Sequence, residues 1–404
     1  MSTLLPVEEA LAYVLAHAPV TKAVLKVQLM EALGGILAED VISPVAVPGD
    51  DNSAMDGYAL RVADADRGLA VSQRIPAGTM GEPLEAGTAA RIFTGAVIPK
   101  GADAVVMQED CQLVNGVVSA SGTVRVGQNI RPRGQDIARG SVVLRAGRKL
   151  RPQDLGLLAS IGASQVTLYR PLKVAVLSTG DELVDPCEVP PATSLAMGQL
   201  YNSNRYTLAG LLRSMNMEVV DGGIIPDEPG ATAGALEAAA HAADCVISSG
   251  GVSVGEEDYV KDQVQRLGRL SLWKLAIKPG KPLAFGAIGD TPFFGLPGNP
   301  TSVFVTFCLL ARPFLLKMQG LTEPEILKIM AVAGFSSNKP GARQEYRRVT
   351  VRSGGRGLEA VSYGNQSSGV LSSVSHSNAL AVIPPGKVIN EGDPVEVIML
   401  DQFS

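Results

Sequence analysis

Between residues 171 and 321, short apolar runs alternate with segments of helical length and spacing. The runs at 173–178, 218–225 and 245–248 are rich in Val and Ile and predict buried strands. The segments between and after them predict helices at 206–215, 232–242 and 257–267. Strands that alternate with helices predict a mostly parallel, doubly wound α/β sheet, in which ligands bind beyond the carboxyl ends of the strands.

The flanking segments show other patterns. Apolar positions recur at helical spacing over 7–17 and 28–38, and again over 152–161. Between 48 and 145, short strand-like runs alternate with turns, and Asn115-Gly116 predicts a β-hairpin. From 322 onward, Gly and Pro again separate short apolar runs. Four domains are expected: a discontinuous N-terminal helical domain (1–47 plus 146–170), an inserted β-rich domain (48–145), the α/β domain (171–321) and a C-terminal small β-barrel (322–404).

Composition narrows the classes of function. The 404 residues carry a net charge of −5 and only 4% aromatic residues, which argues against a nucleic-acid-binding protein. The four cysteines are scattered and there are only three histidines, so a zinc site or a Ser-His-Asp triad is not expected, and any metal should be a hard cation such as Mg²⁺. No secretory signal and no run of eighteen apolar residues is seen, so a cytoplasmic protein without a membrane span is expected.

The stretch 244–301 carries the strongest chemical signal. The loop SGGVSVG at 249–255 follows a predicted strand and precedes an acidic helix start, an arrangement that suits anion binding. Lys274, Lys278 and Lys281 come next, and Lys274 and Lys278 should share one face of an extended strand, about 13 Å apart. Neither G-x-x-x-x-G-K-[ST] nor G-x-G-x-x-G occurs, which excludes a P-loop NTPase and a nicotinamide fingerprint. The stretch predicts an anion-binding α/β domain without naming a reaction.

Two polar stretches in the β-rich segment hold further candidate residues. DDNSAMDGYA at 50–59 has three carboxylates in ten residues, and GQNIRPRGQDI at 127–137 contains Arg131, Arg133 and Asp136. Runs of Asp, Asn, Ser and Gly also make ordinary turns, and the second stretch could be an exposed loop of ion pairs. From the residues alone, both alternatives stay open.

Six motifs follow one another along the chain: DNSAMDGYA (51–59), GADAVV (101–106), STGDE (178–182), SGGVSVG (249–255), KPGKP (278–282) and GLPGNP (295–300). This order closely resembles the molybdopterin molybdotransferase family (MoeA and the E domain of gephyrin) over essentially the full chain. The resemblance implies a central domain of the molybdopterin-binding type and a homodimer whose cleft combines the β domain of one subunit with the α/β domain of the other. It also implies Mg²⁺-dependent insertion of molybdate into adenylylated molybdopterin, with release of AMP and molybdenum cofactor.

The resemblance assigns roles to individual residues. Catalytic positions are Asp56, Asp136, Lys274 and Lys278, and metal-binding positions are Glu182, Asp227 and Asp258. Substrate contacts are expected at Thr94, Arg131, Gly250, Gly251, Ser253, Lys281, Pro297, Pro300, Arg348 and Ser368, with Arg347 and Ser367 as alternatives to the last two. Two departures from the family pattern each remove a charge: Asn202 stands where an aspartate is usual, and Gln135 where a glutamate is usual.

Two other functions fit parts of the sequence. A molybdopterin adenylyltransferase would need only the α/β domain, and the carboxylates outside that domain would have no role in its reaction. A non-catalytic scaffold that binds or delivers the cofactor would not need Asp56 and Asp136, which are both present. A molybdotransferase is therefore the preferred hypothesis, and the partners that it implies are a molybdopterin adenylyltransferase and proteins that mature molybdoenzymes.

Overall fold

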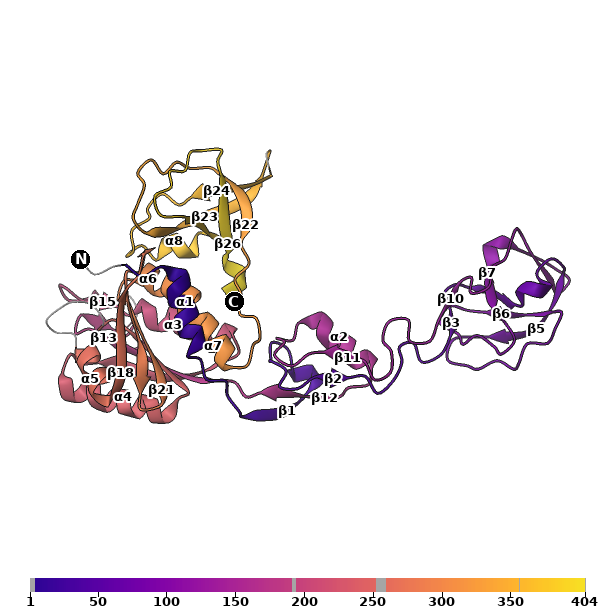
Figure 1. Cartoon of the computed structure of the whole chain (residues 1–404), viewed down its shortest axis with the longest axis horizontal. Coiled ribbons are helices and arrows are strands. Elements are labelled where there is room, and N and C mark those ends of the chain that lie inside the picture. The colour runs from indigo at the N-terminus through magenta and orange to yellow at the C-terminus, as the bar shows by residue number, and fades with distance from the viewer. Residues whose placement is uncertain (1–3, 191–193, 252–258, 356, 404) are drawn as a thin grey trace.

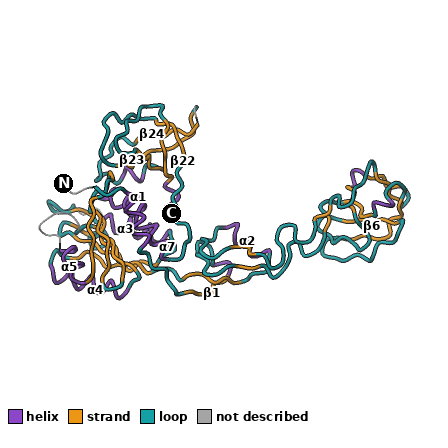
Figure 2. Tube along the Cα trace, in the orientation of Figure 1, coloured by secondary structure: helices purple, strands orange, loops and turns teal. Residues whose placement is uncertain are grey.

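The computed structural model describes residues 4–190, 194–251, 259–355 and 357–403. The molecule is elongated, with an α/β sheet and a β-barrel together at one end and a separate β domain at the other (Figure 1). A small unit that contains α2 (Pro152–Ser160) lies between them. Two chain segments join this middle unit to the far domain, and Figure 2 shows them mostly as loop. The chain thus runs out to the far domain and returns before it enters the α/β sheet.

The α/β domain is built on a six-stranded sheet in the order β16-β13-β17-β21-β20-β18. The first four strands are parallel, while β20 and β18 continue the sheet in antiparallel pairs. Their bounds are β13 (Lys173–Thr179), β16 (Glu218–Ile225), β17 (Cys245–Ser249), β18 (Gly268–Lys274), β20 (Pro282–Ile288) and β21 (Thr291–Leu296). The expected doubly wound sheet is confirmed.

Helices cover both faces of this sheet because successive residues of a strand point to opposite faces. Val174 and Val176 of β13 join the core under one face, whereas Ala175 and Leu177 join the core under the other. The first face is covered by α1 (Val7–Ala16), α3 (Ser203–Ser214) and the helix at 300–318, and the second by α4 (Pro229–Ala242) and α5 (Tyr259–Leu267). The first helix of the chain therefore packs on the α/β sheet through Val7, Ala10 and Val14 and does not join α2.

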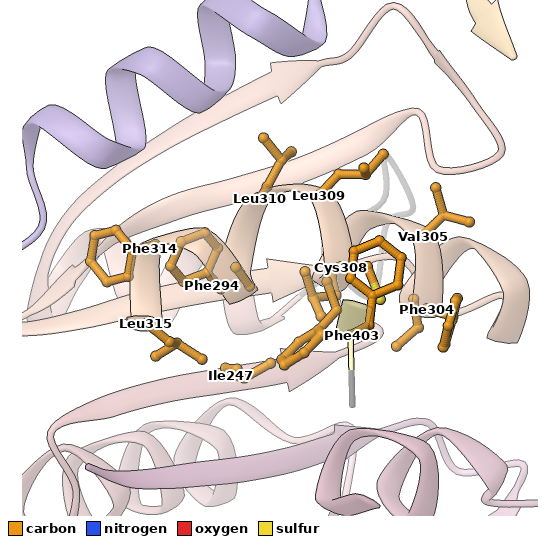
Figure 3. Close-up of a cluster of buried hydrophobic side chains, with 14 of the residues drawn as sticks. Ile247, Phe294, Phe304, Val305, Cys308, Leu309, Leu310, Phe314, Leu315 and Phe403 are labelled. Carbon is orange, nitrogen blue, oxygen red and sulfur yellow. The ribbon is translucent and has the colours of Figure 1, made fainter. Parts of the chain in front are cut away.

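The most buried helix of the molecule runs over Pro300–Met318, as α6 (Pro300–Thr306), a π-helical turn (Phe307–Ala311) and α7 (Arg312–Met318). In Figure 3 its side chains cluster with Ile247 of β17, Phe294 of β21 and Phe403. Among the described residues it is the one helix long and apolar enough to cross a membrane, but 89% of its most apolar window is buried inside the protein. The helix is the centre of the main core.

The middle unit differs from the sequence prediction. The helix expected at 28–38 is wrong: β1 (Val24–Gln28) pairs with β12 (Gln165–Tyr169), and only a 3-10 turn, Leu29–Glu31, follows. Gly34 has φ +76°, and a Cβ on Gly35 would collide with Leu168, so the glycines end any helix here. The helix α2 was expected and is present, and β2 (Val41–Ile42) pairs with β11 (Val142–Leu144).

The far β domain contains a six-stranded sheet in the order β7-β4-β6-β5-β9-β8. The expected hairpin is confirmed: Asn115 and Gly116, both with positive φ, join β8 to β9. The strand bounds are β4 (Gly57–Leu60), β5 (Leu69–Ile75), β6 (Thr88–Ile92), β7 (Ala104–Met107), β8 (Cys111–Val114) and β9 (Val117–Ala120). At the domain's near edge, β3 (Asn52–Ser53) pairs with β10 (Ile130–Arg131).

The C-terminal region forms the expected small barrel. The strand β23 (Gln344–Gly354) pairs with both β24 and β25, which closes the ring β23-β24-β22-β26-β25. The other bounds are β22 (Ile329–Ala333), β24 (Gly357–Ser362), α8 (Ser372–Ser375), β25 (Ala379–Ile383) and β26 (Pro394–Met399). A short strand from the α/β segment, β19 (Ile277–Lys278), adds to β23 and ties the barrel to the α/β domain.

Candidate functional site

A cleft of about 1020 Å³ opens beyond the carboxyl ends of the parallel strands. Its α/β side consists of residues that follow β13, β16, β17 and β21, as expected for a doubly wound sheet, together with the segment 278–282 that leads into β20. Its other side is the loop Gln366–Gly369 of the C-terminal region together with Arg343. The small parallel pair β14 (Leu183–Val184) and β15 (Leu200–Tyr201) borders the same cleft. The site is therefore shared between two structural units of one chain.

The glycine loop after β17 lies in the cleft, as predicted. Gly250 and Gly251 line it with φ of +91° and +65°, a region that favours glycine. A Cβ on Gly250 would lie 2.9 Å from the carbonyl oxygen of Thr179, so the backbone of the two loops can approach only because this residue is glycine. Ser253 and Asp258, which were also expected here, lie outside the described residues.

The lysines of the cluster separate in the structure. Lys278 and Lys281 line the cleft, but Lys274 ends β18 and lies outside the lining. The expectation that Lys274 and Lys278 share one strand is wrong, since the chain leaves the sheet after Lys274 and Lys278 pairs with β23. Lys278 Nζ lies 2.9 Å from Glu345 Oε2. Burial alone would raise the pKa of Glu345, but its hydrogen bonds with Lys278 and Arg347 outweigh burial and lower it.

The second predicted loop also borders the cleft and connects to the C-terminal region. Pro297 and Pro300 line the cleft, and Asn204 Nδ2 donates to the carbonyl of Gly298 at 2.7 Å. The N–H of Thr301, in the first turn of α6, donates to the carbonyl of Ser368 at 3.0 Å. Ser368 and Ser367 both line the cleft. The contacts fix the start of the buried helix against the loop that closes the site.

Arg348 does not line the cleft but lies behind this loop. Its side chain is 1% exposed, and it donates to Ser373 Oγ at 3.1 Å and to the carbonyl of Ser367 at 3.2 Å. Burial lowers the pKa of Arg348 to about 10. Arg347 also lies outside the lining, where it pairs with Glu345. Arg348 can thus support the loop that carries Ser367 and Ser368, while neither arginine reaches the cleft.

Two of the three predicted metal-binding carboxylates, Glu182 and Asp227, line the cleft. Glu182 follows the glycine turn at Gly180, and Asp227 follows β16, with its N–H 3.2 Å from Asp181 Oδ1. In the described part of the chain, no three His, Cys, Asp or Glu side chains come close enough to hold a metal ion by themselves. A cation here would need ligands from a substrate in addition to the protein.

The candidate residues of the inserted domain lie far from this cleft in the same chain. Asp56 lies between β3 and β4, at the end of the molecule opposite the α/β sheet (Figure 1). Its Oδ1 accepts hydrogen bonds from the N–H and the hydroxyl of Thr94 at 2.8 and 2.7 Å, and these bonds lower the pKa of Asp56. Arg131 belongs to β10 and Asp136 to the returning connection, and both are exposed. The structure places Asp56 in contact with Thr94. None of the four candidate residues of this segment, Asp56, Thr94, Arg131 and Asp136, lines the cleft of the same chain.

Sequence reasoning missed part of the lining. Arg343 lines the cleft and donates to the carbonyl of Ile277, although its neighbour Arg348 was chosen. Asn202, which the sequence analysis named only as a departure from the family pattern, lines the cleft at the start of α3. Ser203 and Asn204 line it too and were missed, and their only signal was position, because the start of a helix next to a strand end faces the ligand edge of such a sheet.

Comparison with family models agrees with this architecture. Residues 5–162 match the MoeA N-terminal region (domain I and II), residues 175–317 a probable molybdopterin binding domain, and residues 330–400 the MoeA C-terminal region (domain IV). The fold and the cleft thus define a multidomain protein with a central domain of the molybdopterin-binding class.

Individual relatives extend along nearly the whole chain. A molybdopterin molybdenumtransferase of Haemophilus influenzae is 41% identical over 386 residues, 94% of each chain, and one of Nostoc sp. is 38% identical over 391 residues, 93% of this chain and 88% of the relative. A crystal structure of a molybdopterin biosynthesis MoeA protein from Pyrococcus horikoshii OT3 has a TM-score of 0.84 at 31% identity, covering 98% of this chain and 100% of that one. The chain belongs to the MoeA family.

Proposed function

We propose that the chain is a molybdopterin molybdenumtransferase, which inserts molybdate into adenylylated molybdopterin and releases AMP. The observation that carries this proposal is the cleft, in which a glycine loop, two lysines and Arg343 surround space for an anionic ligand. Relatives with this printed activity match 94% of the chain, so the barrel and the inserted domain are included in the likeness. Neither an adenylyltransferase nor a scaffold is favoured by a specific feature of the cleft.

The cleft can do three things for such a reaction. The glycines at 250 and 251 let a phosphate group approach the backbone closely, and Lys278, Lys281 and Arg343 offset the charge of a pyrophosphate and a molybdate dianion. The loop with Ser367 and Ser368, held from behind by Arg348, closes the site from the barrel side. Holding two anions in one orientation supplies much of the rate enhancement of a group transfer, because the entropy of bringing them together is lost on binding.

A magnesium ion fits the carboxylates at the cleft. Mg²⁺ is typically held by one or two carboxylates together with substrate phosphates, and Glu182 and Asp227 match that requirement. When bound, the ion would neutralise phosphate charge and polarise the phosphoanhydride. Lys278 and Lys281 would then bind those phosphate or molybdate oxygens that the ion does not contact.

The active unit that we propose is a homodimer. Asp56 and Thr94 belong to the far β domain, beyond the middle unit, and Asp136 lies in the connection between these two, so one chain cannot bring them to the substrate in this arrangement. The middle unit exposes large apolar side chains, including Met30 at 91%, which is typical of a surface that another molecule covers. The exposed set is Val24, Leu25, Met30, Leu33, Ile42, Val45 and Val142. A two-fold pair joined there would place the inserted domain of one subunit at the cleft of the other.

The proposed setting is the cytoplasm, since all four cysteines are free and two of them are buried as thiols, as in a reducing compartment. The substrate is an adenylylated pterin, so a molybdopterin adenylyltransferase is the expected supplier and a molybdoenzyme maturation protein the expected recipient. The test of the function is direct: purified protein is mixed with adenylylated molybdopterin, Mg²⁺ and molybdate, and AMP release is followed. Release that is absent, or that does not depend on molybdate, would contradict the proposal.

A further inference from the structure

Asn202, at the start of α3, is a buried side chain in the cleft whose NH₂ group is unpaired among the described residues. It is 2% exposed and lines the cleft. Its Oδ1 accepts the backbone N–H of Arg205 at 3.2 Å, which caps the helix. Its Nδ2 has no partner among the described residues. Buried polar groups are almost always paired in folded proteins, so this donor needs an acceptor other than the described residues, and a ligand in the cleft can supply it.

The orientation of this amide is determined by the helix. The N–H of Arg205 can only donate, so the oxygen of Asn202 must face it and the NH₂ group must face away. The N–H groups of the first turn before Arg205 have no partner within the helix, and a twelve-residue helix carries positive partial charge at this end. Three features therefore coincide at one point of the cleft: a free donor, free backbone N–H groups and a positive helix end.

We propose that the amino-terminal end of α3 is a subsite for a tetrahedral oxyanion, with Asn202 Nδ2 as its specific donor. An oxyanion uses all three features at once, whereas a neutral hydroxyl would use only the donor. Only the identity of the oxyanion rests on the proposed function. It is either a phosphate group of the nucleotide ester or molybdate. The aspartate that is usual at this position in the family would cap the helix equally well but could not donate a hydrogen bond, so the donor is a feature of this chain.

Calorimetry on the full-length protein, with AMP and with molybdate as separate probes, tests the subsite. The key variant is Asn202→Asp, which keeps the shape and the helix cap and removes the donor. Asn202→Ser, which also keeps a cap, is the second variant if the first does not fold. Asn115→Asp, in the β8–β9 turn of the far domain, adds the same charge outside the cleft and is the control. Melting temperatures of all variants show whether the fold is retained.

The expected result is a loss of affinity of about tenfold or more in Asn202→Asp, with the control unchanged. If AMP alone is weakened, the oxyanion is the nucleotide phosphate, and if molybdate alone is weakened, it is molybdate. Affinities for both that stay within about twofold in a folded Asn202→Asp protein overturn the subsite, as does a wild-type chain that binds neither probe. A wild-type chain that binds them but does not turn over contradicts the proposed function and not the subsite.

Discussion

The cleft of the α/β domain and the acidic turn of the inserted domain are built in opposite ways. The cleft gathers residues from positions 179 to 371, which are brought together by a sheet, a buried helix and a barrel loop. The acidic turn needs only two neighbouring loops of one small sheet, in which Asp56, before β4, is held by Thr94, after β6. The first site is concave and carries both cations and carboxylates, and the second is half-buried and carries a carboxylate of lowered pKa.

This difference means that the two halves of the proposed chemistry belong to separate folding units. Each unit has its own core, and among the described residues no hydrogen bond or ion pair joins residues 50–135 to the cleft. Binding and turnover should therefore respond independently to mutation. The following variants are chosen to separate the two responses.

The largest effect is expected from the carboxylates of the inserted domain. Asp56→Asn and Asp136→Asn should each slow AMP release about a hundredfold or more, because a positioned charge is removed from the transition state. Binding of AMP, measured by calorimetry, and the melting temperature should stay near the wild-type values, since the cations that line the cleft are unchanged and neither carboxylate belongs to a core. Asp50→Asn, an exposed neighbour, is the control. Normal turnover in both variants would show that these carboxylates are not catalytic.

Mixing two inactive variants should restore part of this loss. In a dimer with crossed sites, Asp56→Asn in one subunit and Lys278→Ala in the other place both defects in one cleft and leave the second cleft intact. Each mixed dimer should then recover up to about half of the wild-type rate of AMP release. The mixture must first be shown to exchange subunits, for example by mass spectrometry. Exchange without recovery would mean that each cleft is completed by its own chain.

A smaller effect is expected from the cations of the cleft. Lys281→Ala should weaken AMP or molybdate binding by about tenfold at low ionic strength and less at high salt, because the lost interaction is electrostatic. Lys22→Ala is the matched control, since Lys22 is exposed in the chain segment that precedes β1. Lys317 is unsuitable as a control because its Nζ donates to the carbonyl of Leu15. Equal calorimetric affinities for the Lys281 and Lys22 variants would assign Lys281 to ordinary solvated surface.

The smallest effect concerns pH. Two hydrogen bonds from Thr94 stabilise the ionised form of Asp56 and lower its pKa, so turnover that needs the carboxylate should be lost only well into the acid range. Thr94→Val removes the side-chain bond, which should raise the pKa of Asp56 and move the acid limb of the pH–rate profile to higher pH. Thr94→Ser keeps a hydroxyl and should leave the limb near its original place. A limb that does not differ between the two variants would separate Asp56 from the rate-limiting step.

Local sequence patterns were sufficient to predict the elements whose causes lie within a few residues. The Val- and Ile-rich runs of β13 and β17, the Asn115-Gly116 turn and the glycines at Gly250 and Gly251 follow from side-chain shape and backbone freedom within a few residues. The ordered motifs also pointed to the family to which the relatives assign the chain. These elements can be predicted without knowing which distant segments pack against them.

The tertiary structure alone decided what depends on distant pairing. Residues 28–38 have helical spacing, but β1 pairs with β12, more than a hundred residues later, and Gly34 and Gly35 disfavour a helix after it. Lys274 and Lys278 are four residues apart, yet the pairing of β19 with β23 sends only Lys278 into the cleft. The same barrel buries Arg348 and places Arg343 at the site. Strand pairing and the side chains that reach the cleft depend on packing between segments far apart in the chain, so a local pattern of apolar and polar residues cannot predict them.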